Sequence, residues 1–130
     1  MVGETDLAAL LAGLEPVLDD RPYGFVTLPP SSPLPAGLMP FGLVREAEGL
    51  TVIATIGELA AADVAVEGHW ARITMMVHSA LEAVGMTAAM ATALARVGIS
   101  ANVIAAYHHD HLFVPWERRH EALAVLAALG

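Results

Sequence analysis

The clearest alternation of hydrophobic and polar positions runs over Ala71–His78. Ile73, Met75 and Val77 lie on one side of this segment, and mostly polar residues lie on the other. Because side chains alternate across a β-strand, this pattern predicts a strand with one face beneath a helix.

A helix is predicted after that strand, over residues 86–97, because apolar residues recur there at helical spacing. Its apolar stripe comprises Met86, Met90, Leu94 and Val97. Gly98 follows at the position where helices commonly end in a left-handed residue. The apolar, β-branched segment Ile99–Tyr107 is expected to be a strand buried at the centre of a sheet. The remaining elements expected here are a turn at 108–110, a strand over His111–Val114, and a last helix opened by Pro115.

The first part of the chain is expected to hold, in order, a helix over Asp6–Leu14, a turn over Asp19–Pro22, a strand over Tyr23–Leu28, an irregular connection over 29–40, and a hairpin of Phe41–Arg45 with Leu50–Ala54. Five prolines exclude regular structure from the connection and favour an extended path. Thr55 and Glu58 have the spacing of a capping box, which predicts a short helix after the hairpin. The paired carboxylates of Asp19 and Asp20 are expected at a solvated turn.

The natural division lies at Val64–Gly68 and gives an N-terminal half, 1–66, and a C-terminal half, 67–130. The second half reads β-α-β-β-α, which one more strand completes to the ferredoxin-like plan. We therefore predict an α+β fold of two pseudo-symmetric halves, with an antiparallel sheet and helices on one face. A half of this size buries too little apolar surface alone, so the two are expected to share a sheet or a core.

Composition narrows the function classes. Hydrophobic residues make up 56% of the chain and the mean hydropathy is +0.60, yet no apolar run approaches the roughly 18–20 residues that span a bilayer. The chain has no cysteine and no lysine, which excludes disulfides, thiolate chemistry and Schiff bases. A net charge of −8 leaves no basic stripe for nucleic acid. The first residues show no targeting signal, so we expect a cytoplasmic protein.

Several short segments resemble small bacterial proteins with paired ACT-like halves. The segments are Gly24–Pro29, Phe41–Ile53, Arg72–Thr74, Gly85–Ala89, Gly98–Val103 and Tyr107–Pro115. The layout is also similar to the paired ACT domains of the cytosolic arginine sensor of the TOR pathway. The resemblance covers the chain from about Tyr23 to its end and is specific in the order and spacing of the segments.

The resemblance implies a non-enzymatic regulatory protein that binds a small polar metabolite, such as an amino acid, where ACT units meet. It also implies a homodimer or higher homo-oligomer that signals to a separate protein partner, and it predicts no cofactor, no nucleic acid and no membrane contact. The implied ligand-binding residues are His78, Ser79, Glu82, Val84, Gly85, Met86, Ala101, Asn102 and Val103. Gly85 would let the backbone approach a ligand, and free N–H groups beside it favour a carboxylate. Asn102 offers both a donor and an acceptor.

Other interpretations stay open. The protein could oligomerise through its sheets and bind no small molecule. Ser79 and Glu82 have capping-box spacing and could simply start a helical turn. His108, His109, Asp110 and His111 form the most conspicuous polar cluster, but neighbours on a strand point to opposite faces, so a polar hairpin tip is favoured over a metal site. We therefore predict no catalytic and no metal-binding residues.

Overall fold

The computed structural model describes residues 6–76 and 84–130 of the 130-residue chain. The elements in chain order are α1 (Leu7–Ala12), β1 (Pro16–Leu28), β2 (Gly42–Arg45), β3 (Leu50–Thr55), α2 (Ile56–Ala61), β4 (Trp70–Met75), α3 (Met86–Arg96), β5 (Asn102–Ala105), β6 (Asp110–Pro115), the 3₁₀ turn η1 (Trp116–Arg118) and α4 (Arg119–Ala127). The strands follow one another in the order β2-β3-β1-β4-β6-β5. The antiparallel register is explicit where β1 and β2 pair with β3, and where β5 pairs with β6.

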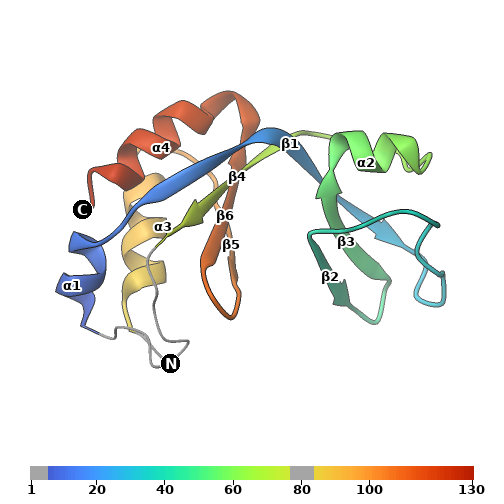
Figure 1. Ribbon diagram of the computed structural model, residues 1–130, viewed down its shortest axis with the longest axis horizontal. Coiled ribbons are helices and arrows are strands. Elements are labelled where there is room, and N and C mark those ends of the chain that lie inside the picture. Colours follow the sequence, from blue (N-terminus) through green and yellow to red (C-terminus); the bar gives the residue numbers. More distant parts are fainter. Residues whose placement is uncertain (1–5, 77–83) are drawn as a thin grey trace. The chain divides into compact units, whose positions relative to one another are not determined.

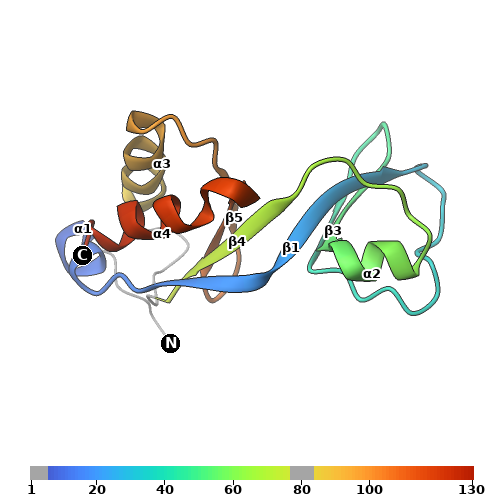
Figure 2. The same ribbon diagram turned by 90° about the horizontal axis from the view of Figure 1, so that it is seen from above.

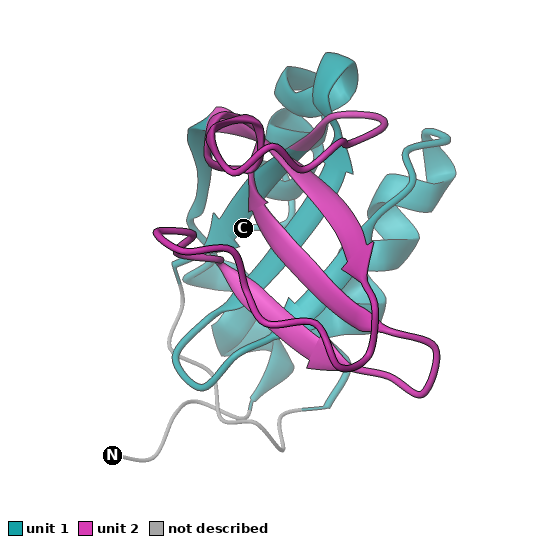
Figure 3. Cartoon of the chain, turned by 90° about the vertical axis from the view of Figure 1, so that its right-hand side faces the viewer, with its two compact units in different colours: residues 1–20, 71–130 teal, residues 21–70 magenta. Residues whose placement is uncertain are grey.

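The chain packs as two compact units (Figure 3). Residues 1–20 and 71–130 form unit 1, and residues 21–70 form unit 2. The long strand β1 contributes its first residues to unit 1 and the rest to unit 2. The predicted division of the sequence into an N-terminal half, 1–66, and a C-terminal half, 67–130, stays a prediction. The two units are defined by packing and have different boundaries.

Unit 1 has the predicted β-α-β-β-α order of β4, α3, β5, β6 and α4, completed by the first residues of β1. The alternation of β4 is confirmed, since Ala71, Ile73 and Met75 are fully buried and the residues between them are not. The helices α3 and α4 lie on the same side of these strands (Figures 1 and 2). Residues of both helices share one apolar core with β4 and β6.

The ends of the helices in unit 1 follow local chemistry. The Asp6 side chain accepts a hydrogen bond from the N–H of Ala8 and starts α1. Gly98 follows Val97, the C-cap of α3, and has φ +72°, as the sequence predicts. The Arg118 guanidinium donates to the carbonyl of Val97 at 2.9 Å, which satisfies an orphan acceptor at the end of α3.

Unit 2 is a three-stranded antiparallel sheet of β2, β3 and the later part of β1, with α2 and the proline-rich connection packed on it. The predicted capping box is confirmed, because the Thr55 Oγ1 accepts from the N–H of Glu58 at 3.2 Å and the Glu58 carboxylate accepts from the N–H of Thr55 at 3.3 Å. A Cβ on Gly24 would collide with Val66 and approach Leu59 to 3.0 Å, so this glycine lets the segments around α2 close on the strand.

Four expectations about local structure are wrong. The turn at Asp19–Pro22 is instead part of β1, which begins at Pro16. The strand expected over Ile99–Tyr107 is short, and β5 lies at the edge of the strand order rather than at its centre. Val97 is 40% exposed and caps α3 rather than joining its buried stripe.

The connection over 29–40 lacks regular structure, as predicted, but it is not simply extended. It contains two turns, closed by N–H groups of Ser32 and Leu38 that donate to the carbonyls of Pro29 and Pro35. Leu38 is only 7% exposed and joins the core of unit 2. In the part of the chain that the structure describes, no helix is long and apolar enough to cross a membrane.

Candidate functional site

The start of α3 is built on a glycine. Gly85 has φ +93°, a left-handed conformation that side chains other than glycine adopt reluctantly. A Cβ at this position would also meet the Cδ2 of Leu7 at 3.1 Å. Among the described residues no side chain caps α3, so the N–H groups of its first turn can donate hydrogen bonds to an anionic group such as a carboxylate.

The two residues beside Gly85 have opposite surroundings. Val84 is 80% exposed, whereas Met86 is 3% exposed and belongs to the core of unit 1. Met86 therefore anchors the first turn of α3, and the backbone is the polar surface that this end of the helix offers. The predicted site residues His78, Ser79 and Glu82 lie outside the described residues.

The second predicted group lies at the start of β5. Ala101 and Val103 are half-buried and pack against the core of unit 1, while Asn102 is exposed. The expected strand at the centre of the sheet would have buried this side chain, but Asn102 is exposed, so its carboxamide can meet a molecule from outside the chain. Its strand is the last in the strand order, so one edge of β5 has no neighbouring strand among those described.

The two groups are separated within one chain by the length of α3. Gly85 precedes its first residue and Asn102 follows its last, and a helix of 11 residues rises about 16 Å. Ile99, three residues before Asn102, donates its N–H to the carbonyl of Leu94 at 3.0 Å, which holds this connection at the far end of the helix. Within one chain the two groups therefore lie at opposite ends of α3.

The strands of unit 1 also carry a polar cluster that the sequence did not predict. Arg72 on β4 donates to the Asp19 carboxylate on β1 at 2.7 Å, and its Nη1 lies 3.0 Å from the Thr74 hydroxyl. The Thr74 hydroxyl lies 2.9 Å from Nδ1 of His111 on β6. Because Ala71, Ile73 and Met75 face the helices, this cluster lies on the other face of the sheet. It links three strands.

The protonation of His111 follows from these surroundings. Burial, together with the charges of Arg72 and His109, lowers the pKa of His111 to about 4. The imidazole is therefore neutral at neutral pH, and its Nδ1 can accept the hydrogen bond of the Thr74 hydroxyl. The polar side of β4 indicates a polar face of the sheet. The sequence did not predict Asp19 as a partner on that face, because its surroundings have the composition of a turn.

The histidine-rich hairpin shows no metal-binding arrangement among residues 6–76 and 84–130, where no three His, Asp or Glu side chains are grouped to hold an ion. The turn is closed by the N–H of Ala106, which donates to the carbonyl of His109 at 3.1 Å. Burial raises the pKa of Asp110, and the nearby His109 opposes that shift. The segment connects the antiparallel strands β5 and β6 as a hairpin.

Taken together, the fold is that of a module with two ferredoxin-like halves, in which backbone donors at a glycine-led helix start are the most evident binding groups. Two family models, both of the ACT domain, match the chain, one over residues 2–69 and the other over residues 65–128. The chain belongs to the ACT domain family. ACT domains are typically regulatory, and the predicted family and fold class are confirmed.

Solved structures extend this comparison. VC0802 of Vibrio cholerae, described as a possible transport protein, is 42% identical, with a TM-score of 0.84 over 95% of this chain and 94% of that one. The regulatory subunit of aspartate kinase from Thermus flavus is 13% identical, with a TM-score of 0.62 over 88% of this chain and 95% of that one. Aspartokinase III of E. coli, in complex with aspartate and ADP, is 13% identical, with a TM-score of 0.63 over 88% of this chain and 32% of that one. The two likenesses at 13% identity show the fold alone. No curated protein matches the chain.

Proposed function

We propose that this protein is a non-enzymatic regulatory module that binds a small polar metabolite, an amino acid in the first instance, between ACT units of two copies of the chain. The observation that carries the proposal is the start of α3, where Gly85 has φ +93° and no described side chain caps the helix. Backbone N–H groups in that position suit an α-carboxylate. The complex of E. coli aspartokinase III with aspartate supports an amino acid as the first ligand to test.

The proposed dimer follows from the separation of the two groups on one chain. Asn102 is exposed on β5, whose outer edge is unpaired among the described strands, and an open edge favours pairing with another strand. A second copy joined there could present its carboxamide to the ligand. Binding would then shift the packing of the two copies, and a separate protein partner in the cytoplasm would read that shift.

A second candidate function is an interaction module that oligomerises and binds no small molecule. It is favoured by the other end of the strand order, where β2 is also an edge and carries the exposed apolar residues Leu43 (46%) and Val44 (52%). Exposed apolar residues on an open edge are typical of surfaces that pair with other chains.

The test is thermal unfolding of the purified protein with each proteinogenic amino acid, on the wild type, Asn102→Ala and Ser100→Ala. Ser100 is an exposed polar residue two positions earlier and serves as the matched control. A ligand at about 100 times its Kd adds about 2.7 kcal/mol and raises the midpoint by several degrees. We expect one class of amino acid to do so in the wild type and in Ser100→Ala, and much less in Asn102→Ala.

Sedimentation equilibrium on the same variants separates the two functions. The proposed function predicts that Asn102→Ala stays dimeric while it loses the ligand response. A dimeric wild type that no amino acid stabilises would instead favour the interaction module. A monomer in the presence of a stabilising ligand would contradict the shared site.

A further inference from the structure

Unit 2 lacks a helix at the position where unit 1 has α3. In unit 1 the chain passes from β4 through α3 to the hairpin of β5 and β6, whereas in unit 2 it passes from β1 through residues 29–41 to the hairpin of β2 and β3. Leu38 is the buried residue of this connection and packs with residues such as Leu59 of α2, and the partly buried Leu34 packs against the same cluster. A looped segment with one buried leucine therefore lies where a packed helix is found in the other unit.

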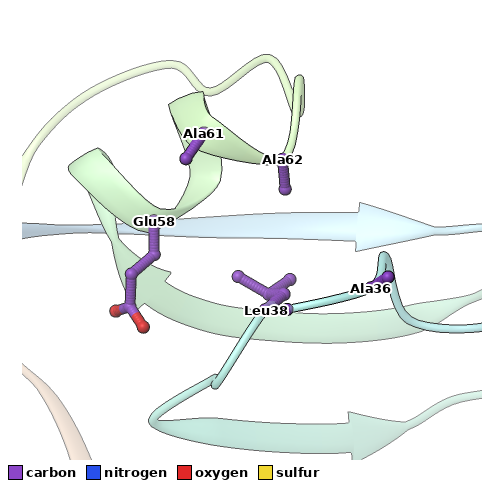
Figure 4. Close-up of a pocket in the computed structure, with 6 residues that line it drawn as sticks. Ala36, Leu38, Glu58, Ala61 and Ala62 are labelled. Atoms are coloured by element: carbon purple, nitrogen blue, oxygen red, sulfur yellow. The ribbon is translucent and has the colours of Figure 1, made fainter.

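The exchange leaves a pocket between the connection and α2 (Figure 4). Its volume is about 270 Å³, and it is lined by Ala36, Gly37, Leu38, Glu58, Ala61 and Ala62. Figure 4 shows Leu38 between Glu58 and Ala36, with Ala61 and Ala62 on the helix above them. Four of the lining residues, Ala36, Gly37, Ala61 and Ala62, have at most a methyl side chain, which leaves space beside Leu38.

The pocket wall is held in place by its own backbone. Leu38 donates its N–H to the carbonyl of Pro35 at 3.2 Å, and Gly37 adopts φ +82° within that turn. Prolines fix φ along the connection and lower the conformational entropy that a ligand would have to remove. The opposite wall is fixed by the capping box at the start of α2. The site is therefore largely preformed, as small-molecule sites usually are.

Glu58 is the charged residue of the lining. The hydrogen bonds described for its carboxylate all use one oxygen, Oε1, which accepts from the N–H of Thr55 and lies 2.7 Å from the Thr55 hydroxyl. A carboxylate has about four acceptor positions, so acceptor capacity remains. Within residues 21–70 two arginines stand against five carboxylates, and this surplus of negative charge favours a cation over an anion.

We propose that this pocket of unit 2 binds a compact organic cation, with an ammonium group on the Glu58 carboxylate and a short apolar chain against Leu38 and the alanines. A volume of about 270 Å³ lies at the lower end of the range for ligand pockets, so the ligand is small. This site is distinct from the proposed amino-acid site at Gly85 and Asn102, and it lies wholly within unit 2. It gives the chain a second ligand. That ligand has a positive group at Glu58, whereas the ligand proposed at Gly85 has a negative group there.

The probe is n-butylammonium, titrated into ¹⁵N-labelled protein and followed by amide chemical shifts. 1-Butanol and butyrate are matched probes with the same chain length and a neutral or negative end. We expect saturable shifts at Gly37, Leu38, Ala61 and Ala62 with butylammonium, weaker shifts at the same amides with butanol, and none with butyrate. Equal binding of butyrate, or no saturable shift with butylammonium, would overturn the proposal.

Three variants locate the site. Ala62→Leu fills the pocket and should abolish the butylammonium shifts, whereas Ala60→Leu, an exposed neighbour on α2 outside the lining, should leave them unchanged. Glu58→Gln keeps a side chain that also serves in capping boxes, so α2 should persist while butylammonium binds about fivefold more weakly and butanol binds as before. Undiminished butylammonium binding in both Ala62→Leu and Glu58→Gln would place the cation elsewhere and refute the inference.

Discussion

Unit 1 and unit 2 place a strand, a connection, a hairpin and a helix in the same order, but they fill the connection differently. Unit 1 uses α3, whose Met90 and Leu94 are fully buried, and the described residues of its core cluster include thirteen that are buried. Unit 2 uses a proline-rich loop, and its corresponding cluster has five. The same plan thus gives one unit with a large helical core and another with a small core and a pocket at its side.

The comparison also separates the two kinds of binding surface. In unit 1 the start of α3 offers backbone donors. In unit 2 the loss of a helix opens a space beside α2 that a side chain carboxylate borders. In unit 1 the binding groups are backbone N–H groups at the end of a helix. In unit 2 a loop stands in place of that helix, and the binding space lies along the side of α2.

The largest expected effect on the free energy of unfolding comes from shortening a buried side chain in the larger core. Leu94→Ala removes a fully buried side chain of α3 and should lower the free energy of unfolding by about 2–5 kcal/mol. Leu59→Ala is the matched change in unit 2, where the side chain is also fully buried. Urea unfolding can be read from Trp116 in unit 1 and from Trp70 in unit 2, each in a variant that retains one tryptophan.

Those two reporters test whether the units differ in stability as well as in structure. If the smaller core limits unit 2, Leu59→Ala should lower the midpoint read from Trp70 more than the midpoint read from Trp116. Identical shifts at both tryptophans for both variants would show that the chain unfolds as one, and the division of the core would then have no energetic consequence.

The next effect concerns the polar cluster, which unit 1 has on its sheet and for which no counterpart is described in unit 2. Arg72→Met should lower the free energy of unfolding by about 2 kcal/mol, because the side chain of Asp19 is only 12% exposed and would keep its charge without this partner. Arg45→Met, on the exposed strand β2, is the control and should change it by less than about 0.5 kcal/mol. Asp19→Asn in the Arg72→Met background should recover part of the loss, and failure to recover any would argue against the ion pair.

A pH dependence follows from His111. Its folded-state pKa of about 4 lies below the ordinary value of 6.5, so the unfolded chain binds more protons between these values and stability should fall as the pH falls from 6.5 to 4. The slope from one group is at most about 1.4 kcal/mol per pH unit, and partial exposure reduces it. The raised pKa of Asp110 acts in the opposite direction.

Urea midpoints between pH 7 and pH 4 measure this slope. The difference between the wild type and His111→Gln isolates the contribution of this residue, because other groups titrate in both proteins. His120→Gln, an exposed histidine of α4, is the control and should keep the slope of the wild type. Equal slopes for the wild type and His111→Gln would contradict the lowered pKa.

The sequence predicted those elements that depend on local chemistry. The alternation of β4, the stripe of α3, the glycine after that helix and the capping box of α2 are all written in residues a few positions apart. The start of β1 was missed because two prolines, two aspartates and an arginine within a few residues have the composition of a turn. Their strand conformation depends on pairing with a distant segment.

The candidate site was less predictable for the same reason. The edge position of β5, and with it the exposure of Asn102, depends on which strands pair, and an apolar run does not specify that. The link between Asp19 and Arg72 joins residues 53 positions apart. The pocket of unit 2 follows from an absent helix, which the prolines predicted, but its lining depends on the turn at Gly37 and on the burial of Leu38.

The smallest expected change in the free energy of unfolding comes from removing the side chain that caps a helix in either unit. Thr55→Ala removes the side chain that caps α2 and should lower the free energy of unfolding by about 1 kcal/mol. Asp6→Ala removes the cap of α1 in unit 1 and should cost a similar amount, read from Trp116 instead of Trp70. Because Thr55 is only 6% exposed and also lies near Glu58, its removal should in addition change butylammonium binding in unit 2, whereas Asp6→Ala should leave that binding unchanged. The Thr55 hydroxyl would then support both the start of α2 and the position of Glu58 in the pocket. Unaltered butylammonium binding in Thr55→Ala would show that the pocket does not depend on this hydroxyl.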